Sequence, residues 1–459
     1  MTLLEELLSL KNEYKNGNKY KILKICGIKI KQKIGKNASC DCDLSKYNPD
    51  TVADNQGGFL RMRVSHKCNC KCSFCYQQYW SDEDQNASMP PEWLYDYCKP
   101  LYERANVILT GGGEITFAKE GYNFCKFLAE NYPKTTVSTE SNGILYDEKW
   151  QNLALENLNM QHFSLNASNP ESFTKHVWKE GGAAIYNKIL GNIISLSKKW
   201  QDAGMSCFTP SVSMVINHEN TYDIYNFVKL ALEHRLKAAW FFFNQQEGAF
   251  NGEEAVFTYP DILEPALKEL MEMERVLAGK FNLYFRLWLP LNATQKLQAE
   301  VEAMSIESLR EKYAELLALA KDRDMVREWE ERNKLREQKG KKLLTIEEDY
   351  FASLHNMTKN LSNGQKKTTC MAPYKSIDIF ANGRMDLCGW IKEPMANFKD
   401  YIIDGKVDWA EILNIPVFQD MREKVLKDDF SYCMDCCPLN PNNPHLNDIM
   451  KYGLKRENP

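Results

Sequence analysis

The residues of this chain best suited to chemistry are cysteines, which form two tight groups. Four lie near the start of the 459-residue chain and five near its end, out of 15 in all: Cys68, Cys70, Cys72, Cys75, Cys370, Cys388, Cys433, Cys436 and Cys437. Thiolates bind soft metals, and grouped cysteines in a reducing compartment more often bind a metal than form disulfides. The first residues lack the basic, apolar and small-residue regions of a signal peptide, so we expect a cytoplasmic protein.

The first group has the spacing Cys68-x3-Cys72-x2-Cys75. Three thiolates can hold three irons of a [4Fe–4S] cubane and leave the fourth iron open to another ligand. With Cys70 as a fourth ligand, the same loop could instead hold a tetrahedral zinc ion. The spacing leaves both sites open, so the elements around the loop must decide between them.

Strand and helix patterns alternate along the chain around this loop. Apolar alternation and short apolar runs predict six strands, at residues 59–65, 107–110, 135–139, 161–165, 208–216 and 238–244. Helical periodicity predicts the helices between them, at residues 92–103, 122–131, 147–157, 187–201 and 222–234. Such an alternation indicates a parallel sheet with crossover helices, and we predict an α/β fold built on a partial (β/α)6 barrel of the TIM type. The cysteine loop follows the first strand, at the end where such barrels place their chemistry.

In this setting the loop resembles the signature of the radical S-adenosylmethionine (SAM) superfamily, C-x3-C-x-aromatic-C, with Phe74 in the aromatic position. The resemblance implies that Cys68, Cys72 and Cys75 hold a [4Fe–4S] cluster that binds SAM, and that the backbone of Tyr76 lies at the adenine pocket. It also implies reductive cleavage of SAM to a 5′-deoxyadenosyl radical, which abstracts a hydrogen atom from a substrate. A flavodoxin- or ferredoxin-type protein would donate the electron. The fourth cysteine of the group lies outside the motif.

Loops after the later strands resemble the SAM-binding loops of the same superfamily. Gly112, Gly113 and Glu114 are similar to the Gly-Gly-Glu motif that binds the methionine amino group, with Ile115 in place of the usual proline. The resemblance implies further SAM contacts from polar residues at the ends of strands three to five: Ser141, Asn142, Ser164, Asn166 and Ser213. Each of these could equally be an ordinary cap or turn residue. Glu140, at the mouth of the barrel, is our candidate for the catalytic proton acceptor or hydrogen donor.

The second cysteine group resembles the first part of a SPASM domain. Cys370-x12-Gly383-x4-Cys388 matches its pattern, and the turn at Asn382-Gly383 predicts a hairpin. Two more thiolates follow, from Cys433 and either Cys436 or Cys437. Because a full SPASM domain carries seven cysteines and this chain has five here, the resemblance implies a shortened, twitch-like domain with one auxiliary [4Fe–4S] cluster. A structural zinc site made by the same thiolates is the alternative.

The patterns divide the chain into four segments. We expect an N-terminal extension (1–58), the barrel (59–250), a helical linker or insert (251–365) and the twitch-like domain (366–459). The first 15 residues read as the start of an amphipathic helix, and residues 19–34 as an edge hairpin or an added strand. The charged stretch 305–342 predicts helices with a solvated face.

Charge and composition constrain the partners. The net charge is −4 and the longest apolar runs are far too short to span a bilayer, so we expect neither a nucleic acid nor a membrane as partner. Residues 27–31 are similar to short Gly-Ile-Lys-Ile-Lys tags at the start of proteins from bacterial surface-polysaccharide loci. On that basis we expect a sugar or similar small polar substrate and an oxidoreductase-type reaction: dehydrogenation, epimerisation or dehydration. The alternatives are a radical SAM maturase of a peptide or protein, and a zinc-stabilised binding protein without catalysis.

Overall fold

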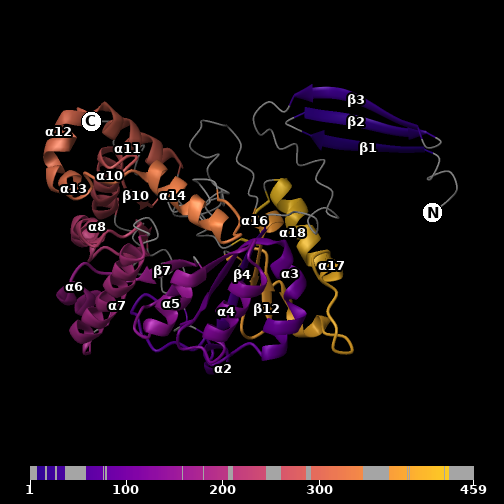
Figure 1. The fold of residues 1–459 in the computed structure, drawn as a ribbon, viewed down its shortest axis with the longest axis horizontal. Coiled ribbons are helices and arrows are strands. Elements are labelled where there is room, and N and C mark those ends of the chain that lie inside the picture. The colour runs from indigo at the N-terminus through magenta and orange to yellow at the C-terminus, as the bar shows by residue number, and fades with distance from the viewer. Residues whose placement is uncertain are drawn as a thin grey trace. The chain divides into compact units, whose positions relative to one another are not determined.

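The computed structural model describes most, but not all, of the chain. The described residues are 8–15, 18–25, 28–36, 58–75, 77, 80–157, 159–178, 180–204, 210–243, 260–285, 291–344, 372–389, 391, 393–427 and 429–433. They belong to two compact units, residues 1–51 and residues 52–459. Figure 1 shows both units, with many of their helices and strands labelled.

The first unit is a three-stranded antiparallel sheet. Strand β2 (Asn18–Ile25) pairs with β1 (Leu8–Lys15) on one side and with β3 (Ile28–Lys36) on the other. The hairpin expected over residues 19–34 is confirmed by β2 and β3. The helix expected over the first 15 residues is wrong for 8–15, because the sequence LSLKNEYK also alternates with period two and pairs along its whole length with β2.

The second unit is built around the predicted parallel sheet. Its six strands are β4 (Gly58–Ser65), β5 (Ala105–Gly112), β6 (Thr136–Ser141), β7 (Met160–Ser164), β8 (Ser211–Ile216) and β9 (Ala238–Phe243). They lie side by side in sequence order, and every neighbouring pair is parallel. This arrangement confirms the α/β class and agrees with the partial barrel.

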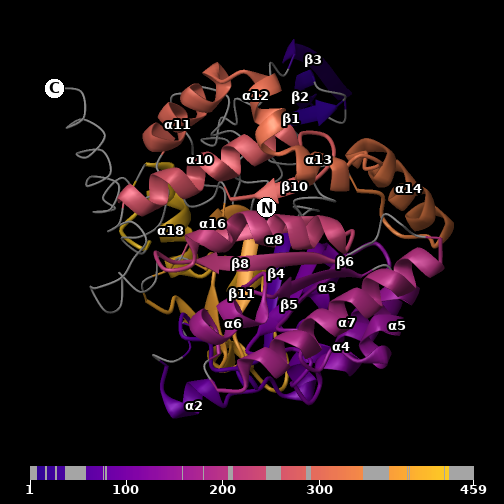
Figure 2. The same cartoon turned by 90° about the vertical axis from the view of Figure 1, so that its left-hand side faces the viewer.

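Crossover helices cover one face of this sheet. They are α3 (Lys99–Arg104), α4 (Gly121–Asn131), α5 (Glu148–Asn157), α6 (Pro170–His176), α7 (Gly182–Asp202) and α8 (Ile224–Glu233). Figure 2 shows α4, α5 and α7 lying along the same side of the strands. Alternate strand residues such as Met62, Ile108 and Phe163 are buried in the core that these helices form. The helix predicted at 92–103 is divided, because the π-helical turn η4 (Trp93–Tyr97) precedes α3.

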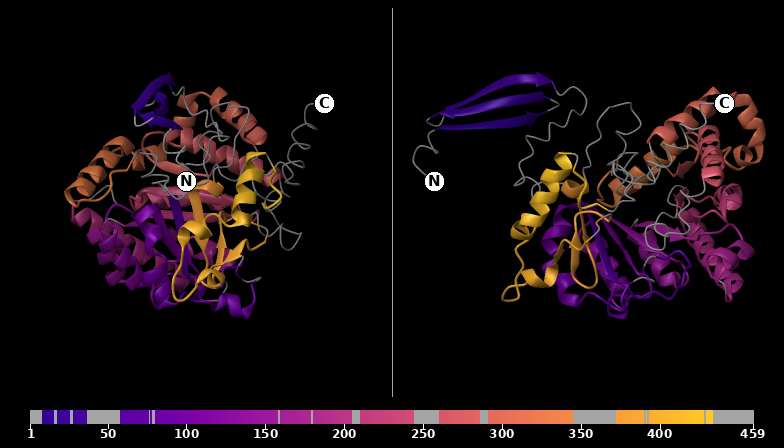
Figure 3. Two further views of the ribbon diagram at one scale, coloured as in Figure 1. Left: turned by 90° about the vertical axis from the view of Figure 1, so that its right-hand side faces the viewer. Right: turned by 180° about the vertical axis from the view of Figure 1, so that it is seen from behind.

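Strands that follow the barrel in sequence extend the sheet at both edges. β10 (Asn282–Tyr284) pairs in parallel with β9, so the prediction of a mostly helical segment after the barrel missed one strand. At the other edge β11 (Ser376–Ile379) pairs in parallel with β4, and β12 (Arg384–Asp386) and β13 (Ala396–Asn397) follow antiparallel. Figure 3 shows this late segment beside the early strands of the sheet. The C-terminal hairpin is therefore part of the same sheet as the cysteine loop.

Helices fill the remainder of the described chain. They are α10 (Pro260–Val276), α11 (Leu291–Ala303), α12 (Ile306–Lys312), α13 (Ala314–Leu319), α14 (Met325–Gln338), α16 (Ala372–Lys375), α17 (Trp409–Ile412) and α18 (Pro416–Leu426), with the short α2 (Asp82–Gln85) after the cysteine loop. Within the described residues, none of the helices is long and apolar enough to cross a membrane.

The charged helix α14 does not present a purely solvated face. Its Glu328, Arg332 and Arg336 are buried. The Arg336 Nη2 atom donates a 3.1 Å hydrogen bond to the hydroxyl of Thr136, the first residue of β6, and Arg323 binds Glu328 through two bonds of 2.8 and 3.0 Å. The helix thus packs against the amino-terminal end of the sheet, opposite to the end where the cysteine loop begins.

Candidate metal centre

The cysteine loop leaves the carboxyl end of β4 and stays close to the sheet. Cys68 is exposed, and Cys70, Cys72 and Cys75 are partly buried. The amide of Cys70 donates to the Cys68 Sγ atom at 3.3 Å, and the amide of Cys75 donates to the Cys72 carbonyl at 3.1 Å. The local turns therefore hold the three motif cysteines in one short loop.

The four thiols differ in their electrostatic surroundings. Hydrogen bonds from Cys70 lower the pKa of Cys68, whereas the thiols of Cys68 and Cys72 raise the pKa of Cys70 because it lies hydrogen-bonded between them. Burial raises the pKa of Cys75 to about 11. A bound cation deprotonates a coordinating thiol, so Cys75, with its raised pKa, needs such a partner to act as a thiolate.

The glycine loop after β5 is locked onto the backbone of the cysteine loop. The amide of Gly113 donates to the Ser65 carbonyl at 2.7 Å, and the amide of Glu114 donates to the Lys67 carbonyl at 2.8 Å. A Cβ at Gly113 would lie 2.2 Å from the Lys67 carbonyl oxygen, and Gly112 has φ +115. Both positions require glycine, because the two loops touch through their backbones. The contact of these glycines in the structure is thus with the cysteine loop itself.

Glu114 is the buried centre of the loops around the cysteines. Its Oε1 atom accepts from the Thr116 amide (2.9 Å), the Thr116 hydroxyl (2.6 Å) and the Ser141 hydroxyl (2.8 Å). Its Oε2 atom accepts from the Asn142 amide at 2.6 Å. The side chain is 1% exposed, and burial raises its pKa. The carboxylate thus fastens the end of β6 to the end of β5.

Asn142, which binds Glu114 through its backbone amide, contacts the cysteine loop through its side chain. Its Nδ2 atom lies 3.8 Å from the Cys68 Sγ atom and donates to the Asn69 side-chain oxygen at 2.8 Å. Its Oδ1 atom accepts from the Ile144 amide at 3.0 Å. Ser141 and Asn142, expected to contact SAM, therefore lie at the cysteine loop, whereas Tyr76 lies outside the described residues.

Asn166, which follows β7 in sequence, joins the ends of β7 and β8. The Asn166 amide donates to the Ser213 carbonyl at 2.8 Å, and its side chain donates to the Ser164 carbonyl and accepts from the Val215 amide. Asn166 has φ 63, in the left-handed region that asparagine tolerates. These bonds give Asn166 a structural role in addition to the predicted contact with SAM, which stays a prediction.

Glu140 lies on the face of the sheet opposite to the helices, which we call the inner face. It is exposed, and the Oε2 atom lies 3.3 Å from where a Cβ of Gly111 would stand. Its direct neighbour on β7 is His162, whose pKa is lowered to about 4, chiefly by burial. The His162 ring also packs edge-on against Trp240 of β9, at 5.1 Å between ring centroids.

Sequence reasoning missed three more charged residues on the inner face. Arg61 and Arg63 of β4 both contact the buried Asp378 of β11, with nitrogen–oxygen distances of 3.3 and 3.5 Å. The signal was present in the β4 sequence, where alternate residues are apolar and the positions between them include both arginines. What the sequence could not supply was Asp378, which is more than 300 residues away.

The second cysteine group is described only in part. Cys388 and Cys433 are both buried, and Cys433 is joined to Ile391, three residues after Cys388, by an antiparallel bridge. The hairpin predicted at Asn382-Gly383 is confirmed, because the turn joins β11 to β12. Cys370, Cys436 and Cys437 lie outside the described residues, so the auxiliary ligand set stays a prediction.

The donor set of the first group suits an iron–sulfur cluster. Within the described part of the chain, no three His, Cys, Asp or Glu side chains are placed to hold a single metal ion. In a cubane each thiolate binds a different iron, so the three sulfur atoms need not converge on one point. Cys68, Cys72 and Cys75 are thus the residues that would hold the cluster.

Comparisons with known proteins agree with this site. The family model described as "Radical SAM superfamily" matches residues 62–231. A FeMo cofactor biosynthesis protein NifB of Methanocaldococcus infernus is 26% identical over 153 residues, which cover 31% of this chain and 51% of that protein. A probable GTP 3′,8-cyclase of Saccharolobus islandicus is 25% identical over 174 residues, which cover 38% and 52%. The chain thus spans about half the length of these curated relatives.

Solved structures resemble a larger part of the chain. The structure titled "Native anSMEcpe with bound AdoMet" has a TM-score of 0.52 and 15% identity, and the match covers 87% of this chain and 97% of that one. At this identity the likeness concerns the fold. Together with the cysteine loop at the end of β4 and the family match, it leads to one conclusion: the chain carries a radical SAM superfamily domain, which includes Cys68, Cys72 and Cys75.

Proposed function

We propose that the chain is an enzyme that binds a [4Fe–4S] cluster through Cys68, Cys72 and Cys75, cleaves SAM reductively and removes a hydrogen atom from a polar substrate. The observation that carries the proposal is the joining of three loops at the carboxyl edge of the sheet. The cysteine loop, the Gly113–Glu114 turn and Asn142 are held together by backbone and side-chain hydrogen bonds.

The chain's own residues would position the reactants. When bound, the cluster and SAM supply the one-electron cleavage and the 5′-deoxyadenosyl radical. The side-chain Nδ2 group of Asn142 lies near the Cys68 sulfur and would stabilise its thiolate form, as a hydrogen-bond donor to sulfur does. Glu114 holds the loops after β5 and β6 together. By the family resemblance, Ser164 and Ser213 would contact SAM from the ends of the next two strands.

Proton transfer would belong to Glu140, with His162 as its neighbour. After hydrogen-atom abstraction from a carbon that bears a hydroxyl, loss of a further electron must be accompanied by loss of a proton. Glu140 is exposed on the inner face, where a carboxylate can accept that proton. The neutral imidazole of His162 is its cross-strand neighbour and would orient it.

The substrate class remains our proposal of a sugar or a similar small polar molecule, changed by dehydrogenation, epimerisation or dehydration. Two features support a small molecule: the charged inner face formed by Arg61, Arg63 and Asp378, and relatives that include a protein named GTP 3′,8-cyclase, whose name specifies a nucleotide substrate. A peptide is the second candidate. It is favoured by the match to anSMEcpe, one of whose structures is titled as containing the Cp18Cys peptide.

A twitch-like auxiliary cluster would complete the enzyme. Cys388 and Cys433 lie on segments joined by the bridge at Ile391, and they would bind it with Cys370 and Cys436 or Cys437. Such a cluster could accept the second electron of a dehydrogenation. We further propose that the protein is cytoplasmic and receives its first electron from a flavodoxin or ferredoxin.

Anaerobic reconstitution with iron and sulfide tests the central proposal. The wild-type chain should contain about eight irons, since each [4Fe–4S] cluster has four, and should produce 5′-deoxyadenosine from SAM with dithionite. Cys68→Ala should lose about four irons and all SAM cleavage. The matched control is Cys98→Ala, since Cys98 is a fully buried core cysteine outside both groups.

The outcome separates the candidate functions. A colourless protein with stoichiometric zinc and no 5′-deoxyadenosine would refute radical chemistry and favour the zinc-stabilised binding protein. Nucleotide-sugar pools and short peptides should then be compared as substrates. A substrate is recognised by a rise in 5′-deoxyadenosine above the uncoupled level, together with a mass change in the substrate.

A further inference from the structure

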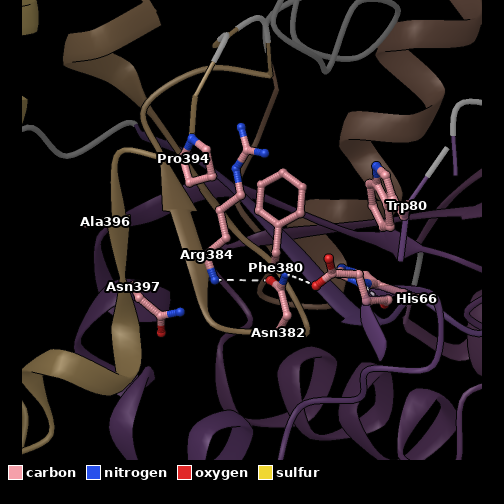
Figure 4. A pocket seen from close by; sticks show the side chains of 9 residues that line it. His66, Trp80, Phe380, Asn382, Arg384, Pro394, Ala396 and Asn397 are labelled. Carbon is pink, nitrogen blue, oxygen red and sulfur yellow. Dashed lines mark hydrogen bonds between the residues drawn. The ribbon is translucent and has the colours of Figure 1, made fainter. Parts of the chain in front are cut away.

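A cavity of about 430 Å3 lies where the start of the cysteine loop meets the C-terminal hairpin. Trp80 and His66 line one side of it, and Phe380, Asn382, Arg384 and Asn397 line the other. Figure 4 shows these side chains around the opening, with Phe380 between Arg384 and Trp80. The volume falls within the range of small-molecule pockets. The roles proposed for SAM and for the cluster use none of these six residues.

Arg384 is held in place with part of its guanidinium group still available. The Nε atom donates to the Asp386 Oδ2 atom at 2.5 Å, and the guanidinium carbon lies 5.0 Å from the centre of the Phe380 ring. Among the described residues, neither of its Nη groups donates a hydrogen bond or forms an ion pair. The side chain is 25% exposed. An arginine fixed through Nε presents its Nη atoms as a fork that suits a carboxylate or a phosphate.

Two aromatic rings form the walls beside this fork. The rings of Trp80 and Phe380 lie 6.4 Å apart between centroids, at an angle of 54°. The Trp80 ring also packs against the His66 ring, with 4.6 Å between the two centroids. The His66 ring is fixed in turn, because its Nε2 atom accepts a hydrogen bond from the Ala381 amide at 3.1 Å. Walls of this kind bind flat apolar groups, because ring faces bury a large area at little cost in conformational entropy.

Several other polar atoms of the cavity are hydrogen-bonded within the protein. Asp84 accepts from the Asn382 side chain at 2.6 Å, and the Asn382 oxygen accepts from the Arg384 amide at 3.1 Å. The Asn397 oxygen accepts from the Lys399 amide at 3.0 Å. Arg384 is therefore the group in the cavity best placed to bind a charged ligand.

We propose that this cavity binds an organic anion, a carboxylate or a phosphate joined to a flat, ring-sized body. The Nη atoms of Arg384 bind the anion, and Trp80 and Phe380 enclose the ring. Because no step of this recognition uses SAM or iron, the inference stands or falls separately from the proposed function.

Calorimetric titration of the full-length, anaerobically purified protein tests the proposal. Phenyl phosphate and phenylacetate are the probes that distinguish the two anions, and benzyl alcohol is the uncharged comparison. At least one anion should bind saturably, and benzyl alcohol at least tenfold more weakly, since a hydrogen bond to a charged group contributes about that factor. Arg384→Lys and Trp80→Leu should each weaken binding of the anion about fivefold or more, because one removes the fork and the other a wall.

The controls separate a lost site from a lost fold. Lys427→Gln removes an exposed cation outside the cavity and should leave the affinity unchanged. Melting curves should show Arg384→Lys folded, because its charge still faces the buried Asp386. No saturable binding of either anion below about 10 mM would overturn the proposal. Affinities left unchanged by both Arg384→Lys and Trp80→Leu would overturn it too.

Discussion

Replacing Glu114 by Gln should show whether this carboxylate organises the site or binds SAM directly. The carboxylate accepts three hydrogen bonds on Oε1 and one on Oε2, all from groups of the protein. Glutamine can keep its oxygen at the first position only by turning its NH2 group toward the amide of Asn142. Two donors would then face each other in a site that is 1% exposed.

The expected cost follows from these bonds. A buried donor left without an acceptor costs about 1–3 kcal/mol, and the three remaining bonds weaken because their acceptor is no longer charged. Removing a buried charge offsets part of this loss, since burial already raises the pKa of Glu114. We expect the free energy of unfolding to fall by about 2 kcal/mol.

The assay combines urea unfolding with amide hydrogen exchange over residues 138–146. Exchange at Asn142 and Gly143 should accelerate, because both amides depend on Glu114 or on its partner Ser141. Glu171→Gln, an exposed change in α6, is the control and should alter neither measurement. Unchanged stability and exchange, combined with a loss of SAM affinity, would refute the organising role and make Glu114 a ligand of SAM.

Three further predictions concern other parts of the molecule. Gly113→Ala should abolish cluster assembly, because its Cβ would lie 2.2 Å from a backbone oxygen, whereas Gly191→Ala on α7 meets nothing within 4 Å and should leave iron content unchanged. His162 has a pKa of about 4 in the folded protein against 6.5 in the unfolded chain, so the unfolded state binds more protons between these values and the free energy of unfolding should fall as pH drops from about 6.5 to 4. The fall should be at most about 3 kcal/mol in urea titrations and smaller in His162→Gln; an equal fall in both would contradict the assignment. Cys388→Ala and Cys433→Ala should each remove about four irons while SAM cleavage persists, and a full iron content in both would exclude them as ligands.

The alternation of strands and helices could be predicted from the sequence, because each strand of the barrel and the helix that covers it are neighbours in the chain. Residues 59–65 and 161–165 predicted β4 and β7 to within a residue, since their apolar pattern is that of a strand packed under helices. The three-residue β10 was missed because it lies in a run of apolar and aromatic residues with no clear period. β1 was misread because its residues fit a strand and a helix almost equally well.

The sequence by itself identified the motifs at the carboxyl end of β4 and the chemistry to expect of them. The spacing of Cys68, Cys72 and Cys75 and the Gly-Gly-Glu turn are contiguous motifs, and their roles depend on neighbours only a few residues away. Together with the alternation of strands and helices around them, these motifs predicted the radical SAM domain that the family match shows.

Only the tertiary structure decided how distant segments meet around that loop. It placed β11 beside β4, so that Asp378 meets Arg61 and Arg63, and it brought Arg384 and Phe380 next to Trp80 to form the cavity. It also showed that Gly112 and Gly113 lie where the backbone of the loop after β5 contacts the backbone of the cysteine loop. Pairing between segments that are hundreds of residues apart leaves no periodic signal in either segment, because each pattern records which face is buried but not which partner buries it.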